Sequence, residues 1–222
     1  MHNSVNKLQY ELAMPARKIT KSAVANISRF TSVNKSEPTI VESYNELLAC
    51  YHFEFSAHVE DYAAQPIKFR FKDNETGDSV TYTPDFWVKL KNGQEFYVEV
   101  KEFATTQKHE FIQWWERIQR NIELVGSEIK LFTDRELRRG KMEENLKLLH
   151  RYLTKTEIND NQIKIIELIR KEPLTISEIS KKIGSSLVST KSLVLNLVSR
   201  KILAFNIYEE ITGDTVLWMP QQ

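Results

Sequence analysis

The chain has 222 residues, of which 41% are hydrophobic and 27% charged, so we expect a folded core rather than disorder. Its 31 Lys and Arg nearly balance its 30 Asp and Glu, so any nucleic-acid-binding surface must be local. The single cysteine, Cys50, excludes an intrachain disulfide and a zinc site built from cysteines. No apolar run approaches the roughly 18–20 residues that span a bilayer, and we expect a cytoplasmic protein with no membrane contact.

Residues 1–36 are basic and sparsely apolar, and we interpret them as a partly flexible N-terminal arm. Two interpretations of this arm stay open: a solvated lead-in, or a segment that lies along a DNA backbone and gains affinity by releasing counterions. In the second interpretation, Arg17, Lys18 and Lys21 would contact phosphates. Glu11 is the only acid of the arm, against the basic residues Lys7, Arg17, Lys18, Lys21, Arg29 and Lys35.

The segment 37–153 has the pattern of one domain that mixes helices and strands. A turn cluster at 73–78 and a second turn at 91–93 separate its apolar runs. Apolar spacing predicts, in chain order, a helix over 40–53, strands over 67–71, 80–90 and 94–101, a helix over 106–123, a strand over 129–133 and a charged helix that ends near 150. Helices and strands around one sheet make an α/β or α+β domain.

A second, smaller domain is expected over 162–222, after a polar linker at 154–161. Thr175 and Glu178 have capping-box spacing, which indicates that a helix begins there. Three helices and a two-stranded hairpin in this length are typical of a winged-helix domain. The pattern predicts helices over 162–169, 175–184 and 187–202 and strands over 203–209 and 215–219.

The register of the hairpin at 80–101 follows from its cross-strand pairs. A two-residue Asn-Gly loop would place Lys89 opposite Phe96 and so set charges against aromatics. A longer loop, with Gly93 in the left-handed conformation, pairs like with like. We therefore predict the second register, because matched cross-strand pairs contribute about 0.2–1 kcal/mol each. Its pairs are Phe86 with Val98, Trp87 with Tyr97, Val88 with Phe96 and Lys89 with Glu95.

In this register Asp85 lies opposite Glu99, and Lys101 shares their face because alternate residues of a strand point the same way. The other face is apolar, and we predict that it faces the core. It consists of Phe86, Val88, Leu90, Phe96, Val98 and Val100. Two converging carboxylates are commonly neutralised by a divalent cation, and oxygen ligands suit Mg²⁺ or Mn²⁺. An exposed hairpin with an ordinary charge pattern is the alternative interpretation.

These residues resemble a known family. Pro84-Asp85 followed by Glu99-Val100-Lys101 resembles the PD-(D/E)xK nuclease signature, and its context over about 40–140 is similar to the TnsA endonuclease subunit of heteromeric cut-and-paste transposases. The resemblance implies a restriction-endonuclease-like nuclease domain with a mixed sheet, followed by a winged-helix domain. The contextual motifs are Glu42-Ser-Tyr-Asn-Glu46, Phe53-Glu-Phe55, Val59-x-x-Tyr62-x-x-Gln65-Pro66 and Tyr82-x-Pro84-Asp85-Phe86.

By this resemblance, Glu46, Asp85 and Glu99 would hold Mg²⁺, for which Mn²⁺ would substitute, and Lys101 would be the catalytic lysine. Glu42 is the alternative to Glu46. Some members of the family have Gln at the position of Glu99, and the carboxylate here favours a competent metal site. Gln65 is expected to support the site without binding the metal.

The charges of the second domain leave its partner open. Residues 160–222 contain eight Lys and Arg against seven Asp and Glu, whereas a dedicated DNA reader is more basic. Winged helices often place their third helix in a major groove, where Lys191 would contact DNA. Contact with a protein is the other interpretation.

The resemblance implies a bacterial endonuclease, associated with the nucleoid when active, that cuts the non-transferred strand at transposon 5′ ends. Its expected partners are the transposon ends, a DDE-type transposase subunit and a regulatory AAA+ ATPase. Two alternatives remain: an autonomous nuclease of restriction or repair, and a non-catalytic adaptor that uses the same fold for assembly.

Overall fold

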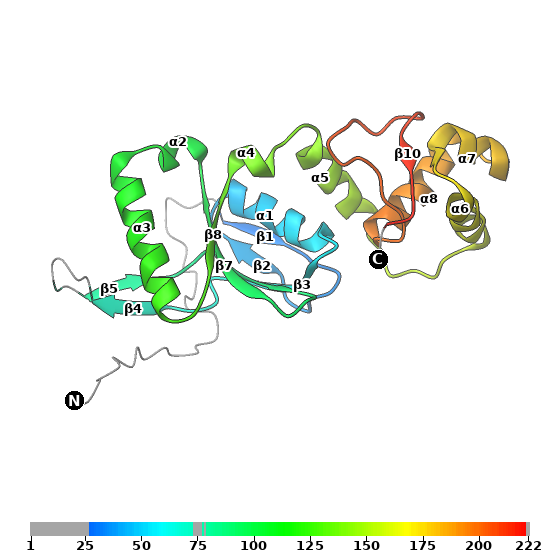
Figure 1. Ribbon diagram of the computed structural model, residues 1–222. Coiled ribbons are helices and arrows are strands. Elements are labelled where there is room, and N and C mark those ends of the chain that lie inside the picture. Colours follow the sequence, from blue (N-terminus) through cyan, green and yellow to red (C-terminus); the bar gives the residue numbers. More distant parts are fainter. Residues whose placement is uncertain (1–26, 73–76, 78, 221–222) are drawn as a thin grey trace. The chain divides into compact units, whose positions relative to one another are not determined.

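The computed structural model describes residues 27–72, 77 and 79–220 (Figure 1). The chain divides into two compact units. The first contains Pro38–Glu136 and the described part of Met1–Phe30, and the second contains Thr31–Glu37 and the described part of Leu137–Gln222. Of the expected DNA contacts, Arg17, Lys18 and Lys21 lie outside the described residues. No helix in the described part of the chain is long and apolar enough to cross a membrane.

The first unit is built on a mixed four-stranded sheet of order β3-β6-β7-β8, in which only β7 and β8 run parallel. Two small hairpins, β1–β2 and β4–β5, accompany it. This mixed α/β architecture fits the expected nuclease-like fold. Its elements are β1 (Ser28–Phe30), β2 (Thr39–Val41), α1 (Tyr44–Phe55), β3 (Val59–Ala64), β4 (Phe69–Lys72), β5 (Ser79–Tyr82), β6 (Phe86–Leu90), β7 (Glu95–Lys101), α2 (Phe103–Thr106), α3 (His109–Leu124), β8 (Ile129–Thr133) and α4 (Asp134–Leu137).

Two predicted element boundaries in this unit are wrong. The helix expected from residue 40 begins at Tyr44, because the Ser43 hydroxyl accepts the Glu46 amide and caps it, while β2 occupies 39–41. The strand expected over 80–90 is two strands, β5 and β6, which belong to different hairpins.

The predicted register of the β6–β7 hairpin is confirmed, with Phe86 opposite Val98 and Trp87 opposite Tyr97. Gly93 has φ +85°, the left-handed conformation expected of it. Phe86, Val88 and Val98 are fully buried, as predicted for the core face. Helix α1 covers this face through Phe53, whose ring lies 5.2 Å from that of Phe86.

The opposite face of the sheet is also covered, which the sequence pattern did not predict. Helix α3 and the β4–β5 hairpin, which lie side by side in Figure 1, pack here in one apolar cluster. Tyr97, on this face of β7, contacts Phe69 edge to face at 5.1 Å. Trp114 and Trp115 are both half-buried against the cluster. Aromatic side chains therefore cover part of the face of β7 that carries Glu99, and this face is not exposed to solvent along its whole length.

The described part of the second unit combines four helices with a two-stranded sheet. Its elements are α5 (Met142–Tyr152), α6 (Asp160–Lys171), β9 (Leu174–Thr175), α7 (Ile176–Ile183), α8 (Leu187–Ser199) and β10 (Val216–Leu217). The capping box of Thr175 and Glu178 is confirmed. Besides Thr31–Glu37, the unit takes in the chain from Leu137 and so includes α5, whereas the sequence pattern grouped that helix with the first domain. The domain bounds 37–153 and 162–222 stay predictions.

The predicted strand over 203–209 is wrong. Within this segment only Ala204 pairs, in an isolated bridge with Trp218, and β10 pairs instead with β9. The cause lies in α5, where the buried Asn145 side chain donates to the carbonyls of Ile207 and Glu209 at 2.8 and 2.7 Å. A side chain that takes these carbonyl groups leaves them unavailable to a strand ladder.

Candidate active site

Asp85 lies at the junction of three strands, immediately before β6. Its Oδ2 accepts the amide of Val100 in β7 at 2.8 Å, and its backbone carbonyl accepts the amide of Gln65, just after β3, at 2.8 Å. The carboxylate thus continues the β6–β7 ladder by one more hydrogen bond. Burial raises the pKa of Asp85 to about 8, helped by the negative charges of Glu99 and Glu46 and opposed by Lys101.

Glu99 follows Val98, the partner of Phe86, so the confirmed register continued by one residue sets it opposite Asp85, and it is only 3% exposed. Both oxygens of its carboxylate are engaged. Oε1 forms an ion pair with Lys101 Nζ at 2.7 Å, and Oε2 accepts a hydrogen bond from the Tyr82 hydroxyl at 2.6 Å. Two strong partners hold this side chain in one orientation.

Lys101 is half-buried on the same strand. Burial alone would lower the pKa of its ammonium group, but the carboxylates of Glu99, Asp85 and Glu46 together outweigh it and raise the pKa. The lysine is therefore a fixed positive charge in the cluster at neutral pH.

Glu46 joins the cluster from the first turn of α1, and it is 8% exposed. Its Oε2 accepts the backbone amide of Glu42 at 2.9 Å, so it also ties down the chain that enters the helix. Burial raises the pKa of Glu46, whereas the positive charge of Lys101 lowers it. The charge of Glu46 is among the largest influences on the pKa of Asp85, which favours Glu46 over the alternative, Glu42, as the cluster member.

Gln65 supports Asp85 through its backbone. It has φ +45°, a left-handed conformation that residues with a side chain rarely adopt, and it precedes Pro66. Such a conformation costs about 1–3 kcal/mol and is commonly found at functional sites. Its amide reaches the Asp85 carbonyl from this position.

Tyr82 is the site residue that sequence reasoning missed as a participant. It ends β5, is 7% exposed, and packs edge to face against Trp114 at 5.8 Å. Its place three residues before Asp85 was visible in the sequence, but the hydrogen bond to Glu99 depends on how the β4–β5 hairpin folds over the sheet.

The three carboxylates offer the hard oxygen donors that Mg²⁺ and Mn²⁺ prefer. Burial first, and then the negative charges of Glu99 and Glu46, raise the pKa of Asp85, and a divalent cation would relieve the repulsion among the three carboxylates. Within residues 27–72, 77 and 79–220, no three His, Cys, Asp or Glu side chains are grouped closely enough to hold a metal ion as they stand. Glu46 and Glu99 would exchange their present hydrogen-bond partners to do so.

Lys191, the expected DNA contact of the second unit, is half-buried on α8. Its Nζ donates to the carbonyl of Ile211 at 2.9 Å. Arg200, at the end of the same helix, donates to the carbonyl of Thr156 at 2.9 Å. Both cations therefore bind backbone oxygens of their own unit.

Comparison with known proteins bears directly on this site. A family model described as TnsA-like endonuclease N terminal matches residues 56–166, half of the chain. The match includes Gln65, Tyr82, Asp85, Glu99 and Lys101, and Glu46 lies before it. No curated protein matches the chain.

Proposed function

The chain belongs to the family of TnsA-like endonucleases, and from this premise we propose that it is the endonuclease subunit of a heteromeric transposase. It would hydrolyse the non-transferred DNA strand at transposon 5′ ends during cut-and-paste transposition. One observation carries the proposal: within the matched region, the β6–β7 register brings Asp85, Glu99 and Lys101 together, and Glu46 interacts electrostatically with Asp85 and Lys101.

We propose that Asp85, Glu99 and Glu46 hold Mg²⁺ or Mn²⁺. When bound, the cation would polarise a phosphodiester and lower the pKa of a water molecule. The protein's own part is orientation. Val100 fixes Oδ2 of Asp85, which leaves Oδ1 without a hydrogen bond from the described residues. Tyr82 and Lys101 fix the two oxygens of Glu99.

Lys101 would contact the substrate as a cation. Its raised pKa keeps it protonated at neutral pH, so it suits binding a phosphate oxygen or orienting the attacking water better than removing a proton. Loss of this charge would also leave Glu99 buried without its ionic partner.

A winged helix in the second unit is part of the proposal. The order α6, β9, α7, α8, with β9 paired to β10 and Ala204 bridged to Trp218, supports it. Because Lys191 and Arg200 bind backbone carbonyls, we favour a protein partner for α8 over DNA. The DDE-type transposase subunit and the regulatory AAA+ ATPase are the proposed partners, with transposon ends as the DNA.

A non-catalytic adaptor is the second candidate. It is favoured by the absence, among the described residues, of a closed group of three metal ligands. Against it stands the burial of Glu99 and Glu46 beside Asp85, because a scaffold gains nothing from converging carboxylates. An autonomous nuclease would share this site and differ in its need for partners.

Strand cleavage of labelled DNA that carries candidate transposon ends tests these proposals. Wild type and Lys101→Ala are compared with Mg²⁺ or Mn²⁺, each with and without the neighbouring transposase. Lys130→Ala is the matched control, since Lys130 on the adjacent strand β8 pairs with Glu128 at 3.4 Å. We expect 5′-end cuts with wild type and Lys130→Ala in the presence of the transposase, and none with Lys101→Ala.

Each other outcome identifies an alternative. Cuts at unrelated sites without the transposase would show an autonomous nuclease. Equal cleavage by wild type and Lys101→Ala would remove Lys101 from the chemistry. No cleavage by any protein, with transposition unchanged by Lys101→Ala, would show the adaptor.

A further inference from the structure

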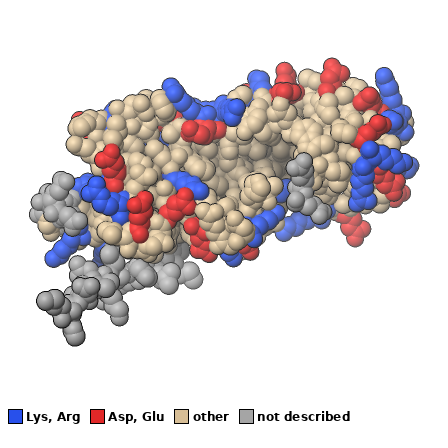
Figure 2. Space-filling model, in the orientation of Figure 1, with Lys and Arg blue, Asp and Glu red and all other residues tan. Residues whose placement is uncertain are grey.

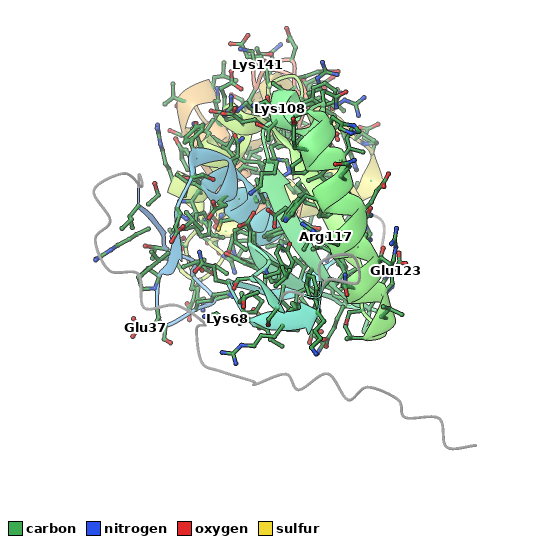
Figure 3. The ribbon with its side chains drawn as sticks, turned by 90° about the vertical axis from the view of Figure 1, so that its left-hand side faces the viewer. Glu37, Lys68, Lys108, Arg117, Glu123 and Lys141 are labelled. Carbon is green, nitrogen blue, oxygen red and sulfur yellow. The ribbon has the colours of Figure 1, made fainter. Side chains whose placement is uncertain are left out.

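Strand β4 carries a row of cations on its outward face. Phe69 and Phe71 of this strand are buried in the cluster with α3, while Arg70 and Lys72 on the strand, and Lys68 immediately before it, are exposed. We call these three residues the β4 row. Figure 3 shows Lys68 at the lower edge of the first unit, while Lys108, the N-cap of α3, and Arg117 and Glu123 on this helix follow one another down the view. Over the face shown in Figure 2, positive and negative side chains are mixed, so a row of one sign is a local feature.

The described cross-strand partners of Arg70 and Lys72 are neutral. Arg70 lies opposite Thr81 and Lys72 lies opposite Ser79, so the outward face presents hydroxyl groups beside the cations. No member of the row forms an ion pair with any residue in 27–72, 77 or 79–220.

Lysines on the strands of the main sheet behave differently. Lys89 on β6 pairs with Glu60 at 3.1 Å, Lys101 on β7 with Glu99 at 2.7 Å, and Lys130 on β8 with Glu128 at 3.4 Å. Within the described residues the β4 row has no such acidic partner, and the acids Asp73, Glu75 and Asp78 of the turn between β4 and β5 lie outside them.

Strand pairing and one hydrogen bond also connect the β4 row to the candidate active site. Phe69 pairs with Tyr82, and the Tyr82 hydroxyl donates to Glu99 at 2.6 Å. The inner end of the row therefore begins at the strand pair that touches the site. Alternate residues of a strand are about 6.6 Å apart, which is close to the separation of successive phosphates along one DNA strand.

We propose that the β4 row binds the phosphate backbone of the DNA duplex beside the cut, through consecutive phosphates of one strand. The inference rests on the proposed endonuclease function and adds the surface that holds its substrate. The contact reads no bases, because lysine and arginine on phosphates position a duplex without specifying sequence. An acidic protein surface is the competing occupant, and the experiment separates the two.

The test measures binding of a short fluorescent duplex of unrelated sequence by the full chain, with EDTA present so that no strand is cut. Anisotropy titrations over a range of salt concentrations compare wild type with the triple variant Lys68→Gln, Arg70→Gln, Lys72→Gln. The control is Lys89→Gln, Lys130→Gln, Lys147→Gln, which removes the same charge at paired lysines, Lys147 being bound to Glu143 at 2.6 Å. Thermal unfolding of each variant confirms folding.

We expect the β4-row variant to bind on the order of 10- to 100-fold more weakly at low salt. The slope of log affinity against log salt should fall by about 2.7, or about 0.9 for each phosphate that the row no longer neutralises. The control should keep the wild-type slope. Equal slopes for all three proteins, or no binding by wild type, would overturn the proposal. Weaker binding by both variants alike would also overturn it, because net charge alone would then be the cause.

This result is independent of the cleavage experiment. If the wild-type protein binds DNA through the β4 row but cuts no DNA, the proposed DNA-binding surface is supported and the proposed endonuclease function is refuted. If the wild-type protein cuts transposon ends and the β4-row variant binds DNA with an unchanged salt dependence, the endonuclease function is supported and the proposed surface is refuted.

Discussion

The Tyr82 hydroxyl donates to Oε2 of Glu99 over 2.6 Å, and both side chains are buried. This bond joins the β4–β5 hairpin to the central strand of the candidate site. Since Lys101 holds the other oxygen of Glu99 at 2.7 Å, Tyr82 and Lys101 together fix the orientation of this carboxylate, and Tyr82 would position it for the proposed cation.

Tyr82→Phe should weaken divalent-cation binding and cleavage by roughly 10- to 100-fold, the usual effect of removing a group that orients a metal ligand. Titration calorimetry with Mn²⁺ and the cleavage rate measure the two effects. Tyr62→Phe is the matched control, because Tyr62 is a buried tyrosine of the same unit that donates to a different buried carboxylate, Glu54, at 3.3 Å. Equal cation affinities for the two variants would refute a positioning role for Tyr82.

Asp85 should make the cation-free protein less stable as the pH rises. Burial and the charge of Glu99 raise its pKa from 3.8 to about 8. Between these values the folded protein holds a proton that the unfolded chain has lost, so the free energy of unfolding falls with rising pH. The contribution of this group is at most about 1.4 kcal/mol per pH unit. The raised pKa of Glu46 acts in the same direction, whereas the raised pKa of Lys101 changes stability only at alkaline pH.

Urea denaturation in EDTA between about pH 5 and pH 8 checks this expectation. Asp85→Asn, which cannot ionise, should flatten the pH dependence and be more stable than wild type near pH 8. Identical pH dependence in wild type and variant would show that Asp85 titrates normally.

Gln65→Gly should stabilise the protein relative to Gln65→Ala by about 1–2 kcal/mol, because glycine adopts the left-handed φ of +45° without a Cβ penalty. Urea denaturation of both variants measures the difference. If Gln65 acts only through its amide on the Asp85 carbonyl, both variants should cleave at the wild-type rate. An alanine variant as stable as the glycine variant would contradict the strain at this residue.

Asn145→Ala should loosen the segment that follows Phe205. The amide of Asn145 satisfies the carbonyls of Ile207 and Glu209, so its loss should reduce the free energy of unfolding by about 1–3 kcal/mol. Hydrogen exchange across 206–210 should become faster. Asn161→Ala, at an exposed position of α6, should change stability by less than about 0.5 kcal/mol. Unchanged exchange in Asn145→Ala would contradict this account.

The sequence predicted structure correctly where interactions between residues close in the chain determine it. The register that sets Asp85 opposite Glu99 follows from matching side chains across one hairpin, and the Thr175 capping box follows from a four-residue pattern. Glu46 was placed by resemblance, since nothing local distinguishes it from another helical glutamate until Ser43 caps the helix and buries its first turn.

What the sequence did not predict depends on contacts between distant segments. The apolar alternation of Leu203, Phe205 and Ile207 indicated a strand, but Asn145, far away in sequence, takes the carbonyl groups. The role of Tyr82 depends likewise on the β4–β5 hairpin and α3 folding over β7. Alternation identifies the faces of a strand, and it does not say what will cover each one.

Because the Val100 amide of β7 donates to Asp85 beside β6, the geometry of the candidate site depends on the alignment of these two strands. A one-residue slip of β7 against β6 would turn Glu99 and Lys101 to the opposite face and take the Val100 amide from Asp85. A chain with misaligned strands would therefore lack the proposed cleavage activity altogether, rather than cut DNA at wrong positions. For a protein proposed to cut DNA, incorrect folding would then cause no stray cleavage, because the proposed site forms only with correct strand alignment.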